Sequence, residues 1–261
     1  MTIQLEHQDQ SSPLFPKLLW ARPESRHSAG KLLLVGGTKQ SFALPATLYA
    51  SADRAGVGAA RIVLPDTLSQ SVKKLIPEAL FAPSTPSGSF ATAAYGDLVA
   101  ESTWADGVFI CNDIGNNSET LVLLEKFIGR YTGILAVPIG PLLALPAASI
   151  LRLFTRDETL FYGNFDGWQR LFKHCSQPAA LRSDMGVVPL AEQLSRLQEG
   201  TQSSFLCDYS GSAMVASGGR VSATPSIKTI DEAATAATVW WLQNPTKPFE
   251  VITTSLIDNP T

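Results

Sequence analysis

Short apolar segments alternate with helical patterns through the first part of the chain, and this alternation restricts the fold more than any other feature. The apolar segments are 32–35, 60–64, 107–111 and 133–137. The helical patterns are 43–54, 68–76, 118–130 and 141–154, the last interrupted by Pro146. Short strands separated by helices are typical of a mostly parallel sheet with helices on both faces. We therefore expect a three-layer α/β fold.

The later part of the chain adds a helix near 189–198 and then a hairpin. Two short apolar segments, 205–207 and 212–216, are separated by the turn residues Ser210 and Gly211. We expect this hairpin to add an antiparallel edge to the sheet. An Ala- and Thr-rich helix follows at 231–243.

The sequence leaves 248–257 open between helix and strand, because this segment is rich in β-branched residues. The segment 82–93 is the clearest loop. The 261 residues, 45% of them hydrophobic, suffice for one large core. We expect a flexible tail at 1–15 and a single domain at 16–261.

Charge and cysteine content restrict the partners and the compartment. The net charge of −3 argues against a nucleic-acid binder, which needs a basic face. Three scattered cysteines form no disulfide framework. No apolar run approaches the roughly 18 residues of a membrane span. We expect a cytoplasmic protein with a small-molecule or protein partner and no membrane association.

Metal ligands and phosphate-binding loops are weakly represented. His7, His27 and His174 are isolated, so the sequence predicts no metal site. Gly36 and Gly37 follow a strand and precede a helix, where backbone N–H groups can approach an anion. The same pair equally suits a plain tight turn, since it matches neither common phosphate-binding motif.

Asp231 stands at the start of the 231–243 helix, where free N–H groups gather. Either Thr229 or Asp231 can serve as the helix cap. Asp231 can instead belong to an anion site or a catalytic site. The residue alone does not decide between these roles.

The order of several motifs resembles the ADP- or ATP-dependent NAD(P)H-hydrate dehydratases of the ribokinase-like superfamily. The similar stretches are 22–30 (RPESRHSAG), 32–38 (LLLVGGT), 43–65, 76–78 (IPE), 105–110 with Gly115, 223–243 and 248–250. Together they cover nearly the whole chain, and their order is more specific than any single motif. The resemblance implies a ribokinase-like fold, mostly parallel and three-layered, with ligands at the carboxyl ends of the strands.

The resemblance also implies chemistry and partners. In this family the phosphate donor is ATP or ADP with Mg²⁺, and the substrate is hydrated NADH or NADPH. A Gly-x-Gly-Asp motif supplies a general base, and Asp231 occupies its position. Relatives are often multimeric, so we expect a homo-oligomer.

The sequence departs from the family where ligands bind. Lys228, Thr229 and Ile230 replace the residues before the motif's Asp, so two glycines are lost, and a β-branched Ile cannot readily adopt a positive φ. Of the family's Gly-Pro-Gly-Leu-Gly, only Gly115 remains. The strand and helix patterns persist while the ligand-binding motifs are worn, which indicates an inherited fold with an altered reaction.

The predicted site contains one candidate catalytic residue, Asp231, and several candidate binding residues. Some of them follow strand ends or match family motifs, although turns and caps explain most of them equally well. The binding candidates are Gly36, Gly37, Glu78, Asn112, Asp113, Gly115, Asn164, Asp166, Lys228 and Thr229.

Three functions follow from these observations. The first is a diverged protein that keeps a cleft for a nucleotide or other anionic small molecule without efficient dehydratase activity. The second is an active dehydratase (a lyase) or small-molecule kinase that uses Asp231. The third is a non-catalytic oligomeric protein, in which the Trp side chains at 104, 168, 240 and 241 anchor an interface. Ordinary core packing is the alternative for these side chains, and the sequence favours it for the pair at 240 and 241.

Overall fold

One ten-stranded sheet organises the part of the chain that the computed structural model describes, which is residues 4–21, 23, 25–176, 181–225 and 228–257. The strand order is β1-β10-β9-β8-β7-β6-β5-β2-β3-β4. The strands are β1 (Leu5–His7), β2 (Lys31–Val35), β3 (Ala59–Pro65), β4 (Leu80–Ala82), β5 (Gly107–Ile110), β6 (Ile134–Pro138), β7 (Thr159–Asn164), β8 (Ser204–Tyr209), β9 (Ser212–Ser217) and β10 (Arg220–Pro225).

The strands are parallel except around β9, which runs antiparallel to both β8 and β10. The turns at 210–211 and 218–219 connect these three strands, and the first of them is the turn that the sequence predicts. β1 pairs in parallel with β10 outside this hairpin region. The expected tail at 1–15 therefore includes a strand, and buried Gln8 donates to the carbonyl oxygen of Thr253 at 2.6 Å.

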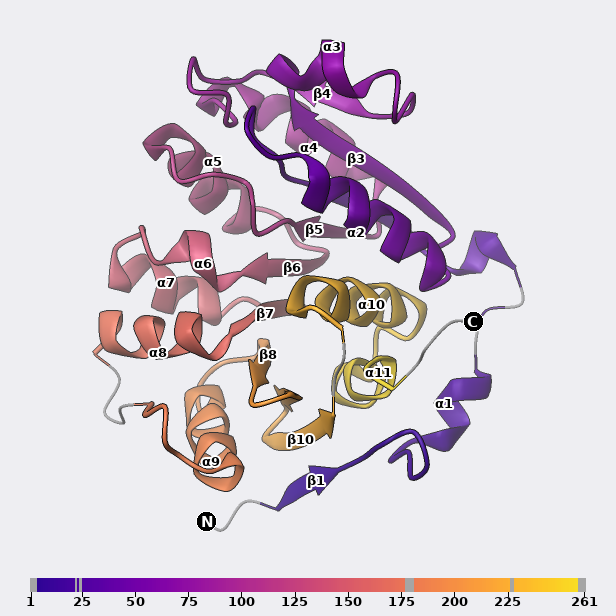
Figure 1. The fold of residues 1–261 in the computed structure, drawn as a ribbon, viewed down its shortest axis with the longest axis vertical. Coiled ribbons are helices and arrows are strands. Elements are labelled where there is room, and N and C mark those ends of the chain that lie inside the picture. The colour runs from indigo at the N-terminus through magenta and orange to yellow at the C-terminus, as the bar shows by residue number, and fades with distance from the viewer. Residues whose placement is uncertain (1–3, 22, 24, 177–180, 226–227, 258–261) are drawn as a thin grey trace.

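Helices cover both faces of the sheet (Figure 1). On one face lie α4 (Tyr95–Trp104), α5 (Ser118–Ile128), α6 (Ile139–Leu142), α7 (Ala147–Phe154), α8 (Phe165–His174) and α9 (Val187–Gln198). On the other face lie α1 (Pro16–Trp20), α2 (Ala43–Arg54), α3 (Ser69–Val72), α10 (Ile230–Gln243) and α11 (Pro248–Ser255). Single 3-10 turns are η1 (Arg26–Ser28), η2 (Asp66–Leu68) and η3 (Thr92–Ala94). None of the helices in the described residues is long and apolar enough to cross a bilayer.

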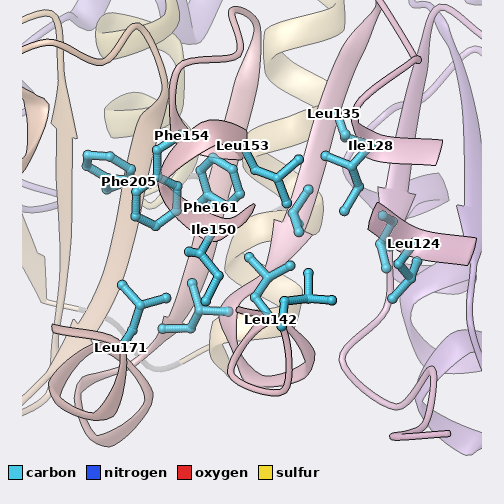
Figure 2. Close-up of a cluster of buried hydrophobic side chains, with 14 of the residues drawn as sticks. Leu124, Ile128, Leu135, Leu142, Ile150, Leu153, Phe154, Phe161, Leu171 and Phe205 are labelled. Atoms are coloured by element: carbon cyan, nitrogen blue, oxygen red, sulfur yellow. The ribbon is translucent and has the colours of Figure 1, made fainter. Parts of the chain in front are cut away.

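Each face buries its own apolar cluster. Figure 2 shows part of the first cluster, where Ile150, Leu153 and Phe154 of α7 meet side chains of the central strands. Phe154 contacts the rings of Phe161 and Phe205 edge-on, with centroids 4.6 and 5.5 Å apart. Close-packed aromatic and aliphatic side chains of this kind give the domain most of its stability.

α10 packs across β5, β6 and β7, with α2 and α11 beside it (Figure 1). Its Ala and Thr side chains are buried, and their small size lets the helix approach the sheet closely. Trp240 and Trp241 are 1% and 3% exposed, and Trp168 of α8 is fully buried. These three side chains are core residues, so they do not anchor an interface, and the core-packing alternative is confirmed for the Trp240 and Trp241 pair. The homo-oligomer stays a prediction.

Most of the expected elements are present, with differences at prolines and in short segments. Pro146 divides the expected 141–154 helix into α6 and α7, because it caps α7 with an extended backbone, ψ 141°. The expected helix at 68–76 shortens to η2 and α3. The open segment 248–257 is helical over Pro248–Ser255, with Pro248 in the first turn.

Candidate functional site

α10 packs against β5, β6 and β7, and Asp231 in its first turn lies near Tyr162 of β7 and near Cys111, which follows β5. Asp231 lies there with 9% of its surface exposed. Its Oδ1 atom is buried and, among the described residues, has no hydrogen-bond partner. A buried carboxylate oxygen without a partner is costly, so this atom is the most unusual feature of the edge.

Asp231 is not the cap of its helix. Thr229 is the N-cap residue, and its Oγ1 accepts a hydrogen bond from the Glu232 amide at 3.3 Å. Glu232 completes a capping box, because its Oε2 accepts from the Thr229 amide at 3.3 Å. Of the two capping roles that the sequence leaves open, Thr229 takes the cap. The Asp231 carboxylate is therefore available for another role.

Tyr162, the fourth residue of β7, borders Asp231. Its hydroxyl donates to the carbonyl oxygen of Ile110 at 2.8 Å, so a hydrogen bond to Asp231 competes for the same proton. Burial raises the pKa of Asp231, and hydrogen bonding with Tyr162 opposes that rise. Burial and the nearby Asp231 carboxylate also raise the pKa of Tyr162 well above its ordinary value.

Asp113 closes the other side of the site, next to the Gly36-Gly37 turn. Its Oδ1 accepts a hydrogen bond from the Gly37 amide at 3.2 Å, and its Oδ2 accepts from Ser41 Oγ at 3.0 Å. Burial raises the pKa of Asp113 to about 6, and the Asp231 carboxylate adds to the rise. The hydrogen bonds from Ser41 and Gly37 oppose the rise but do not cancel it.

Cys111 lies near Asp113 and Asp231, and its side chain explains why position 36 is a glycine. A Cβ on Gly36 would stand 2.4 Å from the Cβ of Cys111, so only glycine fits at position 36. Gly37 has a φ of +86°, which the tight turn requires. Burial, followed by the Asp113 and Asp231 carboxylates, raises the pKa of the Cys111 thiol. The thiol therefore stays protonated and serves as packing.

Three further binding candidates lie in the loop after β5 and just before α10. Gly115, with φ +92°, packs against Ser89 in the loop after β5. Asn112 is exposed and lies near Gly140 at the end of β6. Lys228 is half-buried at the start of α10.

Asn164 and Asp166 belong to the start of α8. The Asn164 side chain caps this helix by accepting from the Gly167 amide at 2.9 Å. Asp166 is exposed and pairs with Arg170 at 3.9 Å. Both therefore have structural roles, which leaves their predicted part in binding unsupported.

Glu78 is exposed and lies before β4, at the opposite end of the strand from the carboxyl edge. It affects Tyr49 of α2, whose pKa is raised by burial first and then by Glu78. The structure does not bring Glu78 together with Asp231.

Sequence reasoning missed Ser41, Tyr162 and Glu232. The spacing of Thr229 and Glu232 matches a capping box and was available as a signal. Tyr162 lies on a strand that the sequence analysis did not expect, and nothing local marks Ser41 as a partner of Asp113.

The family resemblance implies a nucleotide bound with Mg²⁺, so the carboxylates of this edge matter as possible ligands. Across the described residues, no group of three or more His, Cys, Asp or Glu side chains is placed to hold a metal ion. The Asp113 carboxylate already accepts two hydrogen bonds from the chain. The carboxylates of this edge therefore do not fit a divalent cation.

The amino edge of the sheet holds two open cavities of about 490 Å³ each. Both are bordered by Arg130, Tyr131 and Thr132, and the second is also bordered by Arg152 and Arg156. Asp231 and Asp113 border neither of them.

Comparison with known structures identifies the architecture. A ribokinase-like superfamily protein from Enterococcus faecalis aligns over 97% of this chain and 85% of its own, with a TM-score of 0.69 at 15% identity. The fold is ribokinase-like. An ADP/ATP-dependent NAD(P)H-hydrate dehydratase from Bacillus subtilis, co-crystallised with ATP and Mg²⁺, aligns over 94% and 86% of the two chains, with a TM-score of 0.60 at 13% identity.

A pyridoxal kinase from Staphylococcus aureus aligns over 86% of this chain and 84% of its own, with a TM-score of 0.53 at 11% identity. No protein-family model and no curated protein matches the sequence. Identities this low establish the ribokinase-like fold alone, and a fold does not fix a reaction.

Proposed function

We propose that this chain binds a small organic molecule at the carboxyl edge of its sheet, through Asp231, without efficient nucleotide-driven dehydration of hydrated NADH or NADPH. The observation that carries the proposal is the buried Asp231 Oδ1 atom, which has no partner within the described residues. A polar group in that state is satisfied by water or a ligand, and it lies where open α/β sheets bind their ligands.

The cap at the start of α10 supports the same function. Thr229 and Glu232 stabilise the helix terminus, so Asp231 is not needed for it. A residue that contributes a buried charge and no cap costs stability, which is typical of groups retained for binding.

The loss of the family's glycines argues against efficient dehydration. Ile230 stands where the family has a glycine, and its side chain limits how closely a transferring phosphate can approach the backbone. Removing a single oxyanion donor from an enzyme costs about 10²- to 10³-fold in rate. Loss of two glycines from the cradle therefore removes most of the activity.

Thermal unfolding of the whole chain with a panel of sugars, nucleosides, vitamin precursors and nucleotides tests the binding. A ligand at 100 times its Kd adds about 2.7 kcal/mol to the unfolding free energy. We expect at least one compound to raise the Tm of the wild type and to have no effect on the Tm of Asp231→Asn. The absence of any shift, or shifts that persist in Asp231→Asn, would refute the proposal.

An active dehydratase or small-molecule kinase is the second candidate, favoured by the raised pKa and the placement of Asp231. A carboxylate whose pKa is raised by burial is suited to act as a general base on a substrate hydroxyl. The assay supplies hydrated NADH with ATP or ADP and Mg²⁺ and follows the recovery of NADH absorbance. Recovery that falls by about 10²-fold or more in Asp231→Asn would establish this candidate and refute the first.

A further inference from the structure

Two features of this edge have the geometry of anion sites. One is the Gly36-Gly37 turn between β2 and α2, and the other is the start of the 14-residue helix α10. Backbone N–H groups at such turns and helix termini bind phosphates or carboxylates. In this protein, carboxylate side chains of the same chain already accept hydrogen bonds from groups at both features.

Asp113 binds the donors of the glycine turn. Its two carboxylate oxygens take the Gly37 amide and the Ser41 hydroxyl, at 3.2 and 3.0 Å. Asp113 is half-buried, and its own backbone amide adds a further hydrogen bond that favours the ionised form. The position of a bound anion is thus taken by a residue of the protein.

Glu232 likewise accepts hydrogen bonds from groups at the start of α10. Its Oε2 accepts from the Thr229 amide at 3.3 Å and from Thr229 Oγ1 at 2.9 Å, and its Oε1 lies 3.8 Å from Arg54. The carboxylate of Glu232 lies close enough to Asp231 to raise the pKa of Asp231. A phosphate at this edge would lie near the Asp113 and Asp231 carboxylates, with Glu232 next to Asp231, and these carboxylates repel it.

The group that remains available to a ligand is the Asp231 carboxylate, which accepts hydrogen bonds. Asp231 is nine-tenths buried, and its Oδ1 atom has no donor within the described residues. A hydroxyl or an amino group supplies such a donor, whereas a phosphate does not.

We propose that Asp113 and Glu232 act as internal anions that exclude phosphate from this site, which takes an uncharged or cationic molecule whose hydroxyl or amino group donates a hydrogen bond to Asp231. This inference rests on the proposed function, since it assigns the ligand class of the same site. It replaces the anionic ligand that the sequence favours.

Calorimetric titration with pyrophosphate and with ATP, each with and without Mg²⁺, tests the exclusion. We expect no binding to the wild type at millimolar concentration. Asp113→Ala releases the Gly37 and Ser41 donors, and we expect it to bind pyrophosphate at least 10-fold more tightly than the wild type. Asp113→Ser is a second variant that serves if the alanine protein does not fold.

Asp106→Ala is the matched control. Asp106 Oδ2 accepts from the Lys31 amide at 2.9 Å, so this variant also frees a backbone donor, but at the amino edge. We expect it to bind pyrophosphate no better than the wild type. A gain equal to that of Asp113→Ala would contradict the assignment to the carboxyl edge.

The outcomes separate this inference from the proposed function. Wild-type protein that binds pyrophosphate or ATP, or Asp113 variants that fold and gain no affinity, overturns the exclusion of phosphate. The Asp231-dependent Tm shift of a non-phosphorylated compound is measured independently of either result. Shifts confined to phosphorylated compounds would overturn the ligand class while the Asp231 site itself stands.

Discussion

The two edges of the sheet treat their buried polar groups differently. At the amino edge, half-buried Arg156 donates to the carbonyl oxygens of Tyr131 at 2.7 Å and Gly133 at 2.6 Å. It also donates to Asp157 O and Thr159 Oγ1, and so ties the starts of β6 and β7 together. At the carboxyl edge, Asp231 keeps a buried oxygen without a partner in the described residues.

The contrast separates structural from functional polar groups. The Tyr131 hydroxyl at the amino edge also lacks a hydrogen-bond partner among the described residues, but burial raises its pKa to about 12, so it stays neutral at pH 7. An unpaired neutral hydroxyl costs less than an unpaired carboxylate. The amino edge is therefore built for stability, and the carboxyl edge keeps an unfavourable charge that a ligand can compensate.

Removal of Arg156 tests the structural side of the comparison and has the largest expected effect. Arg156→Met leaves several half-buried carbonyl oxygens without donors and should lower the unfolding free energy by about 3–5 kcal/mol. Urea denaturation measures the change. The control is Arg152→Met, which removes an exposed pair with Glu125 and should cost less than about 1 kcal/mol. Equal losses in the two variants would contradict a structural role for Arg156.

Neutralising Asp113 tests how much the charge of a carboxylate at the carboxyl edge lowers the stability of the folded protein. The pKa of its carboxyl is about 6 in the folded protein and about 3.8 in the unfolded chain, so the folded state binds more protons between these values. Stability from this group is present below pH 4 and lost as the pH rises through 6, by at most about 3 kcal/mol. Asp113→Asn should therefore gain stability relative to the wild type as the pH rises from 4 to 7. If the difference in unfolding free energy between Asp113→Asn and the wild type does not change with pH, the pKa of Asp113 is not raised in the folded protein.

The smallest expected effect is at the helix cap. Thr229→Ala removes the capping hydrogen bond of α10 and should cost about 1 kcal/mol in urea denaturation. Asn164→Ala, which removes the cap of α8, should cost a similar amount. Because Thr229 is structural in this account, its replacement should leave the Asp231-dependent ligand shift in place. Loss of that shift in a folded Thr229→Ala protein would assign Thr229 to the binding site.

The sequence predicts the fold better than the site, for physical reasons. Strands β2, β3, β5 and β6 are mostly apolar segments beside Gly or Pro, and buried parallel strands have this local pattern. β4 has three residues and β1 pairs only with β10, far away in sequence, so neither has a local signal. The β8–β9 hairpin was predicted because its turn carries Ser-Gly.

The site depends on contacts between distant segments. Asp113 was predicted from its place after a strand, but its bonds to Gly37 and Ser41 join residues more than 70 positions apart. Such pairings follow from strand order, which a single sequence does not reveal. Asp231 was predicted from its place at a helix start and from the family resemblance, whereas its burial and missing partner came only from the structure.

The central claim, that Asp231 serves a ligand and not the fold, is tested most directly by the stability of Asp231→Asn at neutral pH. Burial raises the pKa of this carboxyl, so the ionised form is unfavourable in the folded state, and an unsatisfied buried polar group costs about 1–3 kcal/mol. We expect the unfolding free energy of Asp231→Asn, measured by urea denaturation at pH 7.5, to equal or exceed that of the wild type. A loss of more than about 1 kcal/mol, as a helix cap shows, would contradict the claim.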